Sequence, residues 1–440
     1  MKKEFIALAS SFFIAFATNL HAQQSMLSDT IQFTKAEAEA LFLQQNVSLI
    51  SEKLNIDKAQ AMVIQARLWP NPTFSIDEVN FWTTASGTNN ETHFGEELPP
   101  LFNDFGRSRQ IALQLEQVVQ TAGKRKKMIA MEEVSASIAE AYFEDLLRNL
   151  KIEFRNNLTA LQYLQLYTAT FSTQLESIES LVKAFQNQLD QGNISRGEFI
   201  RLKALQLELL NTGNELTIEK NEIQKELKIL MNLPPNSYLK ISTDDYSPPL
   251  EKLQNLNLNQ LQEMASASRP DLTMARLEEN YFTNKYAYER AQRIPDLNFS
   301  VGYDRGGNFL LDFVGFGLSF DLPVFDRNRG NIQYARIGKE QSELLTNFKQ
   351  NTIALEVEAG YKNFLANKKL YESIASDYEE QLDRLLESYT SNFKLRNISM
   401  LEYIDFLDAY LENKNIIFET TKKLHNSFEE IQYIIGKELN

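Results

Sequence analysis

The two halves of this chain follow the same plan, which constrains the fold more than any other feature. A helical pattern leads into an alternating segment at "QARLWPNPTFSI" and again at "ERAQRIPDLNFS". A second alternating segment then leads through a Gly or basic turn into a new helix, at "LEQVVQTAGKRKKM" and at "LSFDLPVFDRNRGNI". Self-similarity on this scale indicates one supersecondary unit used twice. We predict a mainly α chain with an internally duplicated order of helix, strand, strand, helix and helix.

The predicted helices are unusually long. No proline occurs from Ala122 to about Asp190, and a helix of that length reaches roughly 100 Å. Its apolar residues follow each other at steps of four and three, from Phe171 through Leu175, Ile178 and Val182. This spacing is typical of a coiled-coil seam. An ordinary antiparallel hairpin in a helical bundle fits the same pattern.

The patterns also set the predicted boundaries. The first repeat covers residues 23–232, with strands at about 71–82 and 109–119 and a helical hairpin at about 122–232. A proline-marked linker follows at 233–257. The second repeat covers 258–440, with strands at about 296–304 and 312–322 and a hairpin at about 328–438.

Residues 1–22 have the pattern of a secretory signal peptide. Lys2 and Lys3 precede an apolar core, and Ala22 stands at a plausible cleavage point. Beyond this leader no window approaches 18 apolar residues, so a helical membrane anchor is not expected. The chain has no Cys, which excludes disulfides and an N-terminal lipidated cysteine. Its net charge of −14 argues against nucleic acid as a partner.

The alternating segments have the period of strands with one apolar face. In the clearest case Val314, Phe316, Leu318 and Phe320 alternate with small or polar residues, and we predict that these four face lipid. Segments of about ten residues with aromatic ends suit a transmembrane β-barrel, although a half-buried soluble sheet gives a similar pattern. Four strands are too few for a barrel, which needs about eight, so several chains would share one.

Together these features resemble the TolC-like outer-membrane efflux protein family, and its CzcC/CusC-like branch in particular. The matching phrases are "WPNPTFSI", "TAGKRKKM", "RPDL", "LPVFDRNRGNI" and the two "NIS" turns. The resemblance implies a homotrimer with a shared twelve-stranded barrel in the outer membrane. It also implies a long α-helical tunnel in the periplasm, which meets a periplasmic adaptor protein and an inner-membrane pump of the RND type.

The chain departs from the family pattern in two ways. Many members carry a lipid on an N-terminal Cys, which this chain lacks, so the barrel alone would anchor it in outer-membrane lipid. Arg396 stands where the family usually has Gly. A left-handed turn costs about 1 kcal/mol more for a residue other than Gly, which leaves open a different turn there.

Two groups of residues are candidates for function. The first comprises the helix-to-helix turns Gly192, Asn193, Ile194, Ser195 and Arg396, Asn397, Ile398, Ser399. As turn and capping residues they are fully explained by local chemistry. The resemblance additionally implies that these tips contact the adaptor.

The second group comprises the acids Glu402, Asp405 and Asp408, which follow the second tip at steps of three. One explanation is a solvated helix face near a helix N-terminus, where the dipole favours acids. The other is a periplasmic aperture, because threefold symmetry would turn each acid into a ring that favours cations. Glu402 and Asp405 match the family's aperture acids better than Asp408 does.

Basic clusters occur where strands lead into helices, at residues 123–127 and 326–330. They are solvated turns, or they meet anionic groups at the periplasmic membrane surface. Aromatic residues suited to a membrane interface are Trp69, Phe81, Trp82, Tyr303, Phe313 and Phe325. Thr83–Ser108 would form a long extracellular loop.

The sequence does not support catalysis. His93 and His425 stand alone, and there is no HExxH motif, no Cys and no nucleophile elbow, so we predict no enzyme, no cofactor and no built-in metal site. The predicted function is the outer-membrane channel of a tripartite efflux system that passively conducts metal ions or small toxic compounds. The alternative is a periplasmic coiled-coil scaffold without a pore. The cargo is not encoded in this chain.

Overall fold

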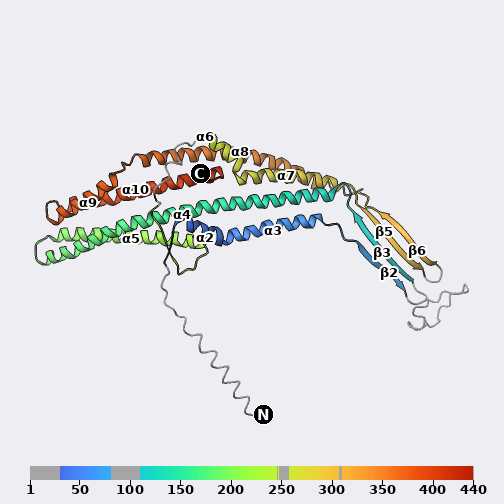
Figure 1. The fold of residues 1–440 in the computed structure, drawn as a ribbon, viewed down its shortest axis with the longest axis horizontal. Helices are drawn as coiled ribbons and strands as arrows, with labels where there is room; N and C mark the ends of the chain where they lie inside the picture. Colours follow the sequence, from blue (N-terminus) through green and yellow to red (C-terminus); the bar gives the residue numbers. More distant parts are fainter. Residues whose placement is uncertain (1–29, 81–109, 245, 247–256, 307–309, 440) are drawn as a thin grey trace, which may run out of the picture. The chain divides into compact units, whose positions relative to one another are not determined.

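The computed structural model describes residues 30–80, 110–244, 246, 257–306 and 310–439. The elements are β1 (Thr30–Phe33), α2 (Lys35–Gln45), α3 (Val47–Arg67), β2 (Thr73–Asn80), β3 (Gln110–Val119), α4 (Lys124–Asp190), α5 (Arg196–Leu230), β4 (Tyr238–Ile241), α6 (Leu258–Ser268), α7 (Pro270–Ala291), β5 (Leu297–Gly306), β6 (Leu310–Ser319), α8 (Arg329–Glu372), α9 (Tyr378–Lys394) and α10 (Met400–Ile435) (Figure 1). The predicted signal peptide and extracellular loop, and with them Phe81, Trp82 and His93, lie outside the described residues.

The chain forms two compact units that cut across the two sequence repeats. One unit comprises Met1–Ile50, Leu147–Ala265 and Glu356–Asn440, and the other comprises Ser51–Leu146 and Ser266–Leu355. We call them the helical unit and the sheet unit. Each repeat thus contributes two strands to the sheet unit and one helical hairpin to the helical unit.

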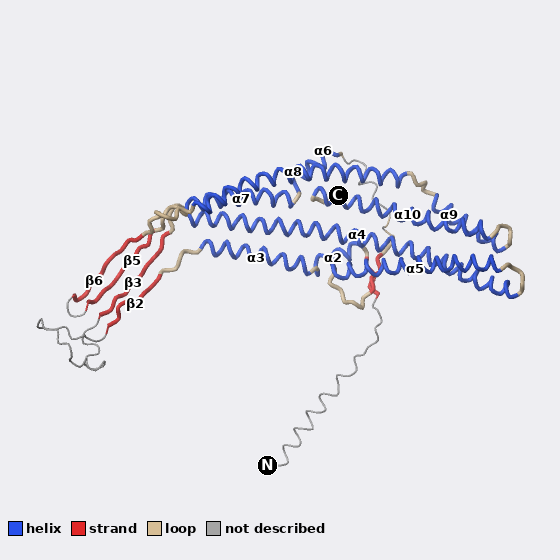
Figure 2. The backbone as a smooth tube through the Cα atoms, turned by 180° about the vertical axis from the view of Figure 1, so that it is seen from behind, coloured by secondary structure: helices blue, strands red, loops and turns tan. Residues whose placement is uncertain are grey.

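The sheet unit contains one antiparallel sheet with the strand order β2-β3-β5-β6. Strands β3 and β5, which come from different repeats, pair along ten residues. The helices that enter or leave these strands follow the same order, α3, α4, α7 and α8, and Figures 1 and 2 show them side by side. Direct contacts support this order: Arg67 on α3 pairs with Glu133 on α4 at 2.7 Å, and Lys349 on α8 pairs with Asp271 on α7 at 2.7 Å.

The helical unit is held together by an apolar core between its long helices. Helix α4 runs for 67 residues and contains neither Gly nor Pro, so nothing in its sequence interrupts the backbone ladder. Its buried Tyr167, Phe171 and Ile178 share one core with residues of α5, α9 and α10. The ring centroids of Phe185 on α4 and Phe393 on α9 lie 5.6 Å apart.

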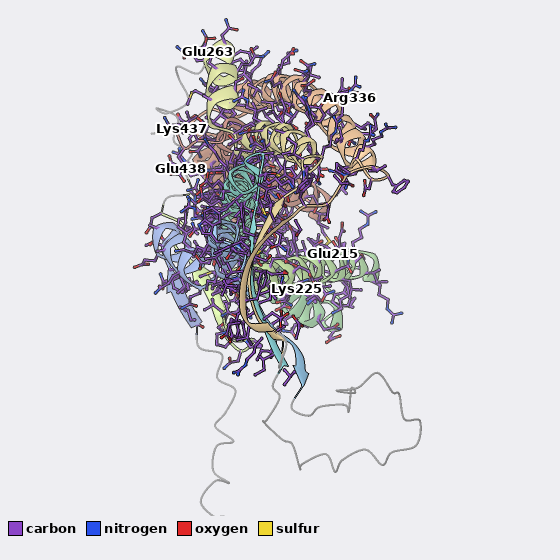
Figure 3. The ribbon with its side chains drawn as sticks, turned by 90° about the vertical axis from the view of Figure 1, so that its right-hand side faces the viewer. Glu215, Lys225, Glu263, Arg336, Lys437 and Glu438 are labelled. Carbon is purple, nitrogen blue, oxygen red and sulfur yellow. The ribbon has the colours of Figure 1, made fainter. Side chains whose placement is uncertain are left out.

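An ionic cluster ties the ends of the chain to α4. The Arg155 guanidinium donates to Glu39 on α2 at 2.7 Å and to Glu429 on α10 at 3.0 Å. It also pairs at 2.8 Å with Glu438, which follows α10 and is labelled in Figure 3. Lys151, one turn away on α4, lies 3.0 Å from the same Glu438 carboxylate. Because three elements meet at one guanidinium, the cluster fixes their register.

The segment predicted as a linker contains a strand. Residues 238–241 form β4, which pairs in parallel with β1. Two glutamine side chains complete its hydrogen bonds: Gln224 on α5 exchanges two bonds with the Leu239 backbone, and Gln165 on α4 exchanges two with the Ile241 backbone. A two-stranded sheet is marginal by itself. These amides act as further strand partners, which a short, proline-flanked sequence gives no means of predicting.

The second helical hairpin differs from its prediction. We expected one uninterrupted helix to lead to the second tip, but the helix ends at Glu372 and restarts as α9 at Tyr378. No Gly or Pro lies between them. The Ser373 hydroxyl donates to the Leu370 carbonyl at 2.6 Å, and the Asp377 carboxylate accepts from the Gln381 side chain. The Ser373 hydroxyl competes in this way with the helical ladder, whereas the Asp377 side chain makes no capping hydrogen bond to the backbone of α9.

Among the described residues, no helix is long and apolar enough to cross a membrane.

Candidate functional site

One face of the four-stranded sheet is apolar across all its strands. The register places Leu115 on β3 opposite Phe74 on β2 and opposite Val301 on β5, and Val301 lies opposite Phe316 on β6. Because side chains alternate between the two faces, residues two positions away extend the same face. These are Ile76, Leu113, Phe299, Tyr303, Val314 and Leu318. The Phe316 side chain is 85% exposed, and Phe74, Val301 and Val314 are exposed as well, so the described residues leave this face largely uncovered.

The opposite face of the sheet carries polar and small residues. Its central rows contain Ser75, Gln114 and Glu116 on β2 and β3, and Ser300, Gly302 and Gly317 on β5 and β6. Three of the four residues predicted to face lipid, Val314, Phe316 and Leu318, therefore share the apolar face. Phe320 is exposed but follows the end of β6 at Ser319, so it does not belong to the strand.

The first tip is a left-handed turn of the Schellman type. Gly192 has φ of +77°. Its N–H donates to the Leu189 carbonyl at 2.9 Å, and the Asn193 N–H donates to the Gln188 carbonyl at 2.9 Å. Such a turn satisfies the last carbonyls of a helix, and Gly adopts its backbone conformation without steric cost.

The second tip is the same turn, although Arg396 replaces the glycine. Arg396 has φ of +61°. Its N–H donates to the Phe393 carbonyl at 3.0 Å, and the Asn397 N–H donates to the Asn392 carbonyl at 2.9 Å. The substitution thus leaves the turn unchanged, and the strain of a left-handed Arg is held in place by the surrounding hydrogen bonds.

Each tip leads into a capping box. The Ser195 hydroxyl accepts from the Glu198 N–H at 3.2 Å, and the Glu198 carboxylate accepts from the Ser195 N–H at 2.9 Å. Ser399 and Glu402 repeat this exchange at 3.2 and 2.8 Å. In both cases the backbone hydrogen bond from the serine lowers the pKa of the glutamate, and the serine hydroxyl adds to the effect. Glu402, predicted as an aperture acid, thus has a local role that Glu198 shares.

The other two acids of the second tip are exposed on α10. Asp405 and Asp408 lie on α10, and Glu208 belongs to α5 in the first hairpin. Although Asp408 is exposed, the surrounding protein partly desolvates its carboxyl and raises its pKa, and the neighbouring charges of Glu208 and Asp405 raise the pKa further. The structure therefore brings together acids from both hairpins. Sequence spacing did not reveal Glu208, because it is remote in sequence from the other two.

A buried lysine holds α9 against α10 behind these acids. The side chain of Lys414 is 5% exposed, and its Nζ lies 2.7 Å from Glu379 and 2.9 Å from Asp383, both on α9. The Tyr410 hydroxyl donates to Asp383 at 2.8 Å. Closer to the tip, the rings of Tyr389 and Phe406 stack at 4.1 Å. This half of the hairpin is therefore fixed by charge as well as by packing, which the sequence analysis did not foresee.

Neither the described histidine nor the acids form a metal site. His425 is buried, and its Nε2 lies 2.6 Å from the Tyr246 carbonyl oxygen, which makes it a packing residue. Across the described parts of the chain, no group of three or more His, Cys, Asp or Glu side chains is arranged to hold a metal ion.

Comparison with known proteins finds similar sequences among outer membrane efflux and metal-resistance proteins. The model of the outer membrane efflux protein family matches residues 261–394. The nickel-cobalt-cadmium resistance protein NccC of Alcaligenes xylosoxydans xylosoxydans is 23% identical, over 77% of this chain and 72% of its own length. The cobalt-zinc-cadmium resistance protein CzcC of Cupriavidus metallidurans is 22% identical, over 71% and 69% of the two chains.

Solved structures show the same fold over nearly the whole chain. CusC, described as forming a transmembrane channel, matches with a TM-score of 0.70 at 14% identity and covers 96% of each chain. The outer membrane protein VceC of Vibrio cholerae matches with a TM-score of 0.70 at 16% identity, covering 92% of this chain and 97% of VceC.

The fold and these matches define the class of the protein: it has the mainly helical fold of the TolC-like channels. These matches confirm the predicted resemblance to the TolC-like outer-membrane efflux proteins and to their CzcC/CusC-like branch. The matching family is that of outer membrane efflux proteins, and VceC is described as an outer membrane protein.

Proposed function

We propose that three copies of this chain build one passive exit duct of a tripartite efflux system. The sheets would join into a twelve-stranded barrel in the outer membrane, and the helices would line a periplasmic tunnel. An inner-membrane pump of the RND type and a periplasmic adaptor would supply the cargo and the energy. The observation that supports this proposal most directly is the exposed apolar face of the sheet. This face needs an apolar environment outside this chain.

The open edges of the sheet unit support assembly with further copies. Strands β2 and β6 each have one unpaired edge, and exposed edges favour pairing with another chain. The flanking helix α8 carries exposed apolar side chains at heptad-related steps, Tyr334, Ile337, Leu344 and Phe348. At the other edge, α3 exposes Leu54 and Ile64, and Leu68 is exposed directly after it. Joining two different edges is a heterologous contact, which closes into a ring when the rotation permits.

The acids near the tips support a cation-favouring aperture. We infer that Asp405 and Asp408, together with Glu208, form this aperture, whereas Glu402 chiefly caps α10. The names of the two metal-resistance relatives favour divalent metal cations as the cargo over other toxic compounds. The pKa of Asp408 is raised first by desolvation and then by the nearby charges of Glu208 and Asp405, and the second effect supports the clustering because like charges disfavour ionisation.

Conductance in a planar bilayer tests the aperture. Replacing Asp405 and Asp408 together by Asn should lower the cation-to-anion permeability ratio severalfold, because the field of fixed charges sets selectivity. Glu402→Gln is the matched control, since Gln also serves at this capping position and only the charge is lost. An unchanged ratio in the double variant would reject the aperture.

The half-buried Ile194 supports a role for the first tip in docking. Ile194→Arg should abolish efflux while the assembly still forms, because a charge would have to be buried against the adaptor. Asn187→Arg, on the exposed surface of the last turn of α4, controls for added charge. Full efflux by the Ile194 variant in a metal-resistance assay would exclude adaptor contact at this residue.

A further inference from the structure

The four junctions between helices and strands in the sheet unit touch one another in a row. We define this junction row as residues 67–72, 120–127, 289–296 and 320–329. At one end, the Arg125 guanidinium lies 4.3 Å from the Trp69 ring centroid and donates to the Arg67 carbonyl at 2.6 Å. The first two junctions are thereby joined, with an aromatic ring and a cation in direct contact.

The remaining junctions are joined by polar contacts. Lys124 Nζ lies 2.8 Å from the Asp296 carboxylate, and the Thr121 N–H donates to the same carboxylate at 2.9 Å. The Asn328 amide donates to the Glu289 carbonyl at 2.9 Å. The junction row is therefore one continuous surface feature and not four separate turns.

The junction row is cationic although the chain is acidic. It contains nine Lys or Arg residues and four Asp or Glu residues, whereas the whole chain has 45 and 59. Part of the acid is already neutralised, since Asp296 pairs with the buried Lys124. Lys126 and Arg293 are exposed, and within the described ranges no ion pair is recorded for either. Positive charge is thus available along the row.

Large apolar side chains project from the same row. Trp69 is 61% exposed, Leu322 is 71% exposed, and Phe325 is fully exposed (101%). The row adjoins the helix-proximal end of the sheet's apolar face, where Leu297 on β5 lies opposite Val119 on β3. Exposed aromatics next to Lys and Arg, beside an apolar band, are typical of a membrane–water interface.

We propose that the junction row binds the anionic headgroups of phospholipids in the periplasmic leaflet. This rests on the proposed function, since it requires the sheet to lie in the membrane. The Arg and Lys side chains meet the lipid phosphates and acidic headgroups, while Trp69 and Phe325 enter the acyl boundary. A second copy of the chain does not fit along the whole row, because it would bring another net-cationic row against this one.

Trp69 provides a direct probe of this contact. In a Trp82→Phe background Trp69 is the sole tryptophan. The full-length protein is reconstituted into vesicles that contain phosphatidylcholine and phosphatidylglycerol in equal mole fractions. In one preparation the phosphatidylcholine carries the bromine label, and in the other the phosphatidylglycerol carries it. We expect brominated phosphatidylglycerol to quench the fluorescence of Trp69 at least about twofold more than brominated phosphatidylcholine does. The reason is that one Lys or Arg near the membrane surface favours the anionic lipid by up to about fivefold.

A charge variant and a matched control sharpen the test. Replacing Lys126, Arg293 and Arg327 by Gln should bring the quenching ratio close to one, while Arg125 stays to hold the Trp69 ring. The control replaces Arg336, Lys339 and Lys362 by Gln, three exposed cations in helix-surface pairs with no contact to the row, and should keep the ratio of the parent protein.

The outcomes separate this proposal from the proposed function. Equal quenching by both lipids in the parent protein would overturn the headgroup site while leaving membrane insertion intact. An assembled, inserted protein whose Trp69 no lipid quenches would also overturn it, because another copy would then cover the row. Failure of the protein to associate with vesicles at all would instead contradict the proposed function.

Discussion

At the residue scale, the two tips show how local chemistry and function overlap. The sequence analysis assigned Asn193, Ser195 and their counterparts to turn and capping roles, and these are the roles that the backbone hydrogen bonds display. It left open a different turn at Arg396, yet the same turn forms. Arg disfavours the left-handed backbone conformation, but Arg396 adopts it because the helices on both sides, with their capping box, fix where the chain must reverse.

Gly192 and Arg396 occupy the same position in the two tips, so replacing each of them tests the strain of the left-handed turn. Arg396→Gly should stabilise the second tip by up to about 1 kcal/mol, and Gly192→Ala should destabilise the first by about the same amount. Space does not interfere, since a Cβ at Gly192 would meet no atom within 4 Å. Hydrogen exchange of the tip amides should slow in the former variant and accelerate in the latter. If the hydrogen-exchange rates changed in the same direction at both tips, the backbone angle φ would not be what distinguishes the two turns.

The acids after the second tip were the least predictable residues. Glu402 was assigned to an aperture by its position, whereas its hydrogen bonds with Ser399 identify a capping role that Glu198 shares. A capping box can be recognised from the S-x-x-E spacing, so this signal was present in the sequence. The proximity of Glu208 to Asp408 was not, because only the packing of the two hairpins brings these carboxylates together.

At the element scale, strand patterns carried more information than helix patterns. Alternation at Phe299–Val301 and Val314–Leu318 assigned the side chains to faces, and the register joins these faces across the sheet. The long apolar-periodic stretches indicated helices but not the break between α8 and α9, where the Ser373 hydroxyl bonds to the Leu370 carbonyl. Strand β4 escaped prediction because its partners, strand β1 and the side chains of Gln165 and Gln224, lie outside the short segment itself.

The two faces of the sheet make opposite predictions for an added charge. Phe316→Arg places a cation in the apolar band, which costs about 2–4 kcal/mol for a residue near the middle of a membrane. We expect the amount of heat-resistant assembly in the outer-membrane fraction to fall severalfold. Gln114→Arg, on the polar face, is the matched control and should assemble normally. Equal loss in both variants would show that the apolar face does not meet lipid.

At the scale of the whole molecule, duplication explains the division into two units. Neither repeat forms a unit alone, because each supplies half of the four-stranded sheet and half of the helical core. Within the described residues, a single copy also leaves both sheet edges unpaired and the apolar sheet face largely exposed. The incompleteness of the single chain is the reason that assembly in a membrane is central to its proposed function.

Disulfide cross-linking between the two sheet edges tests this central claim most directly. The chain has no Cys, so Ser319→Cys on β6 can be combined in turn with Thr73→Cys and with Ser75→Cys on β2. Within one copy these edges are about 14 Å apart across the sheet, which is too far for a disulfide. We predict that oxidation of outer membranes yields covalent dimers and trimers and nothing larger. Monomers alone, or a ladder that continues beyond three, would contradict the closed three-copy duct.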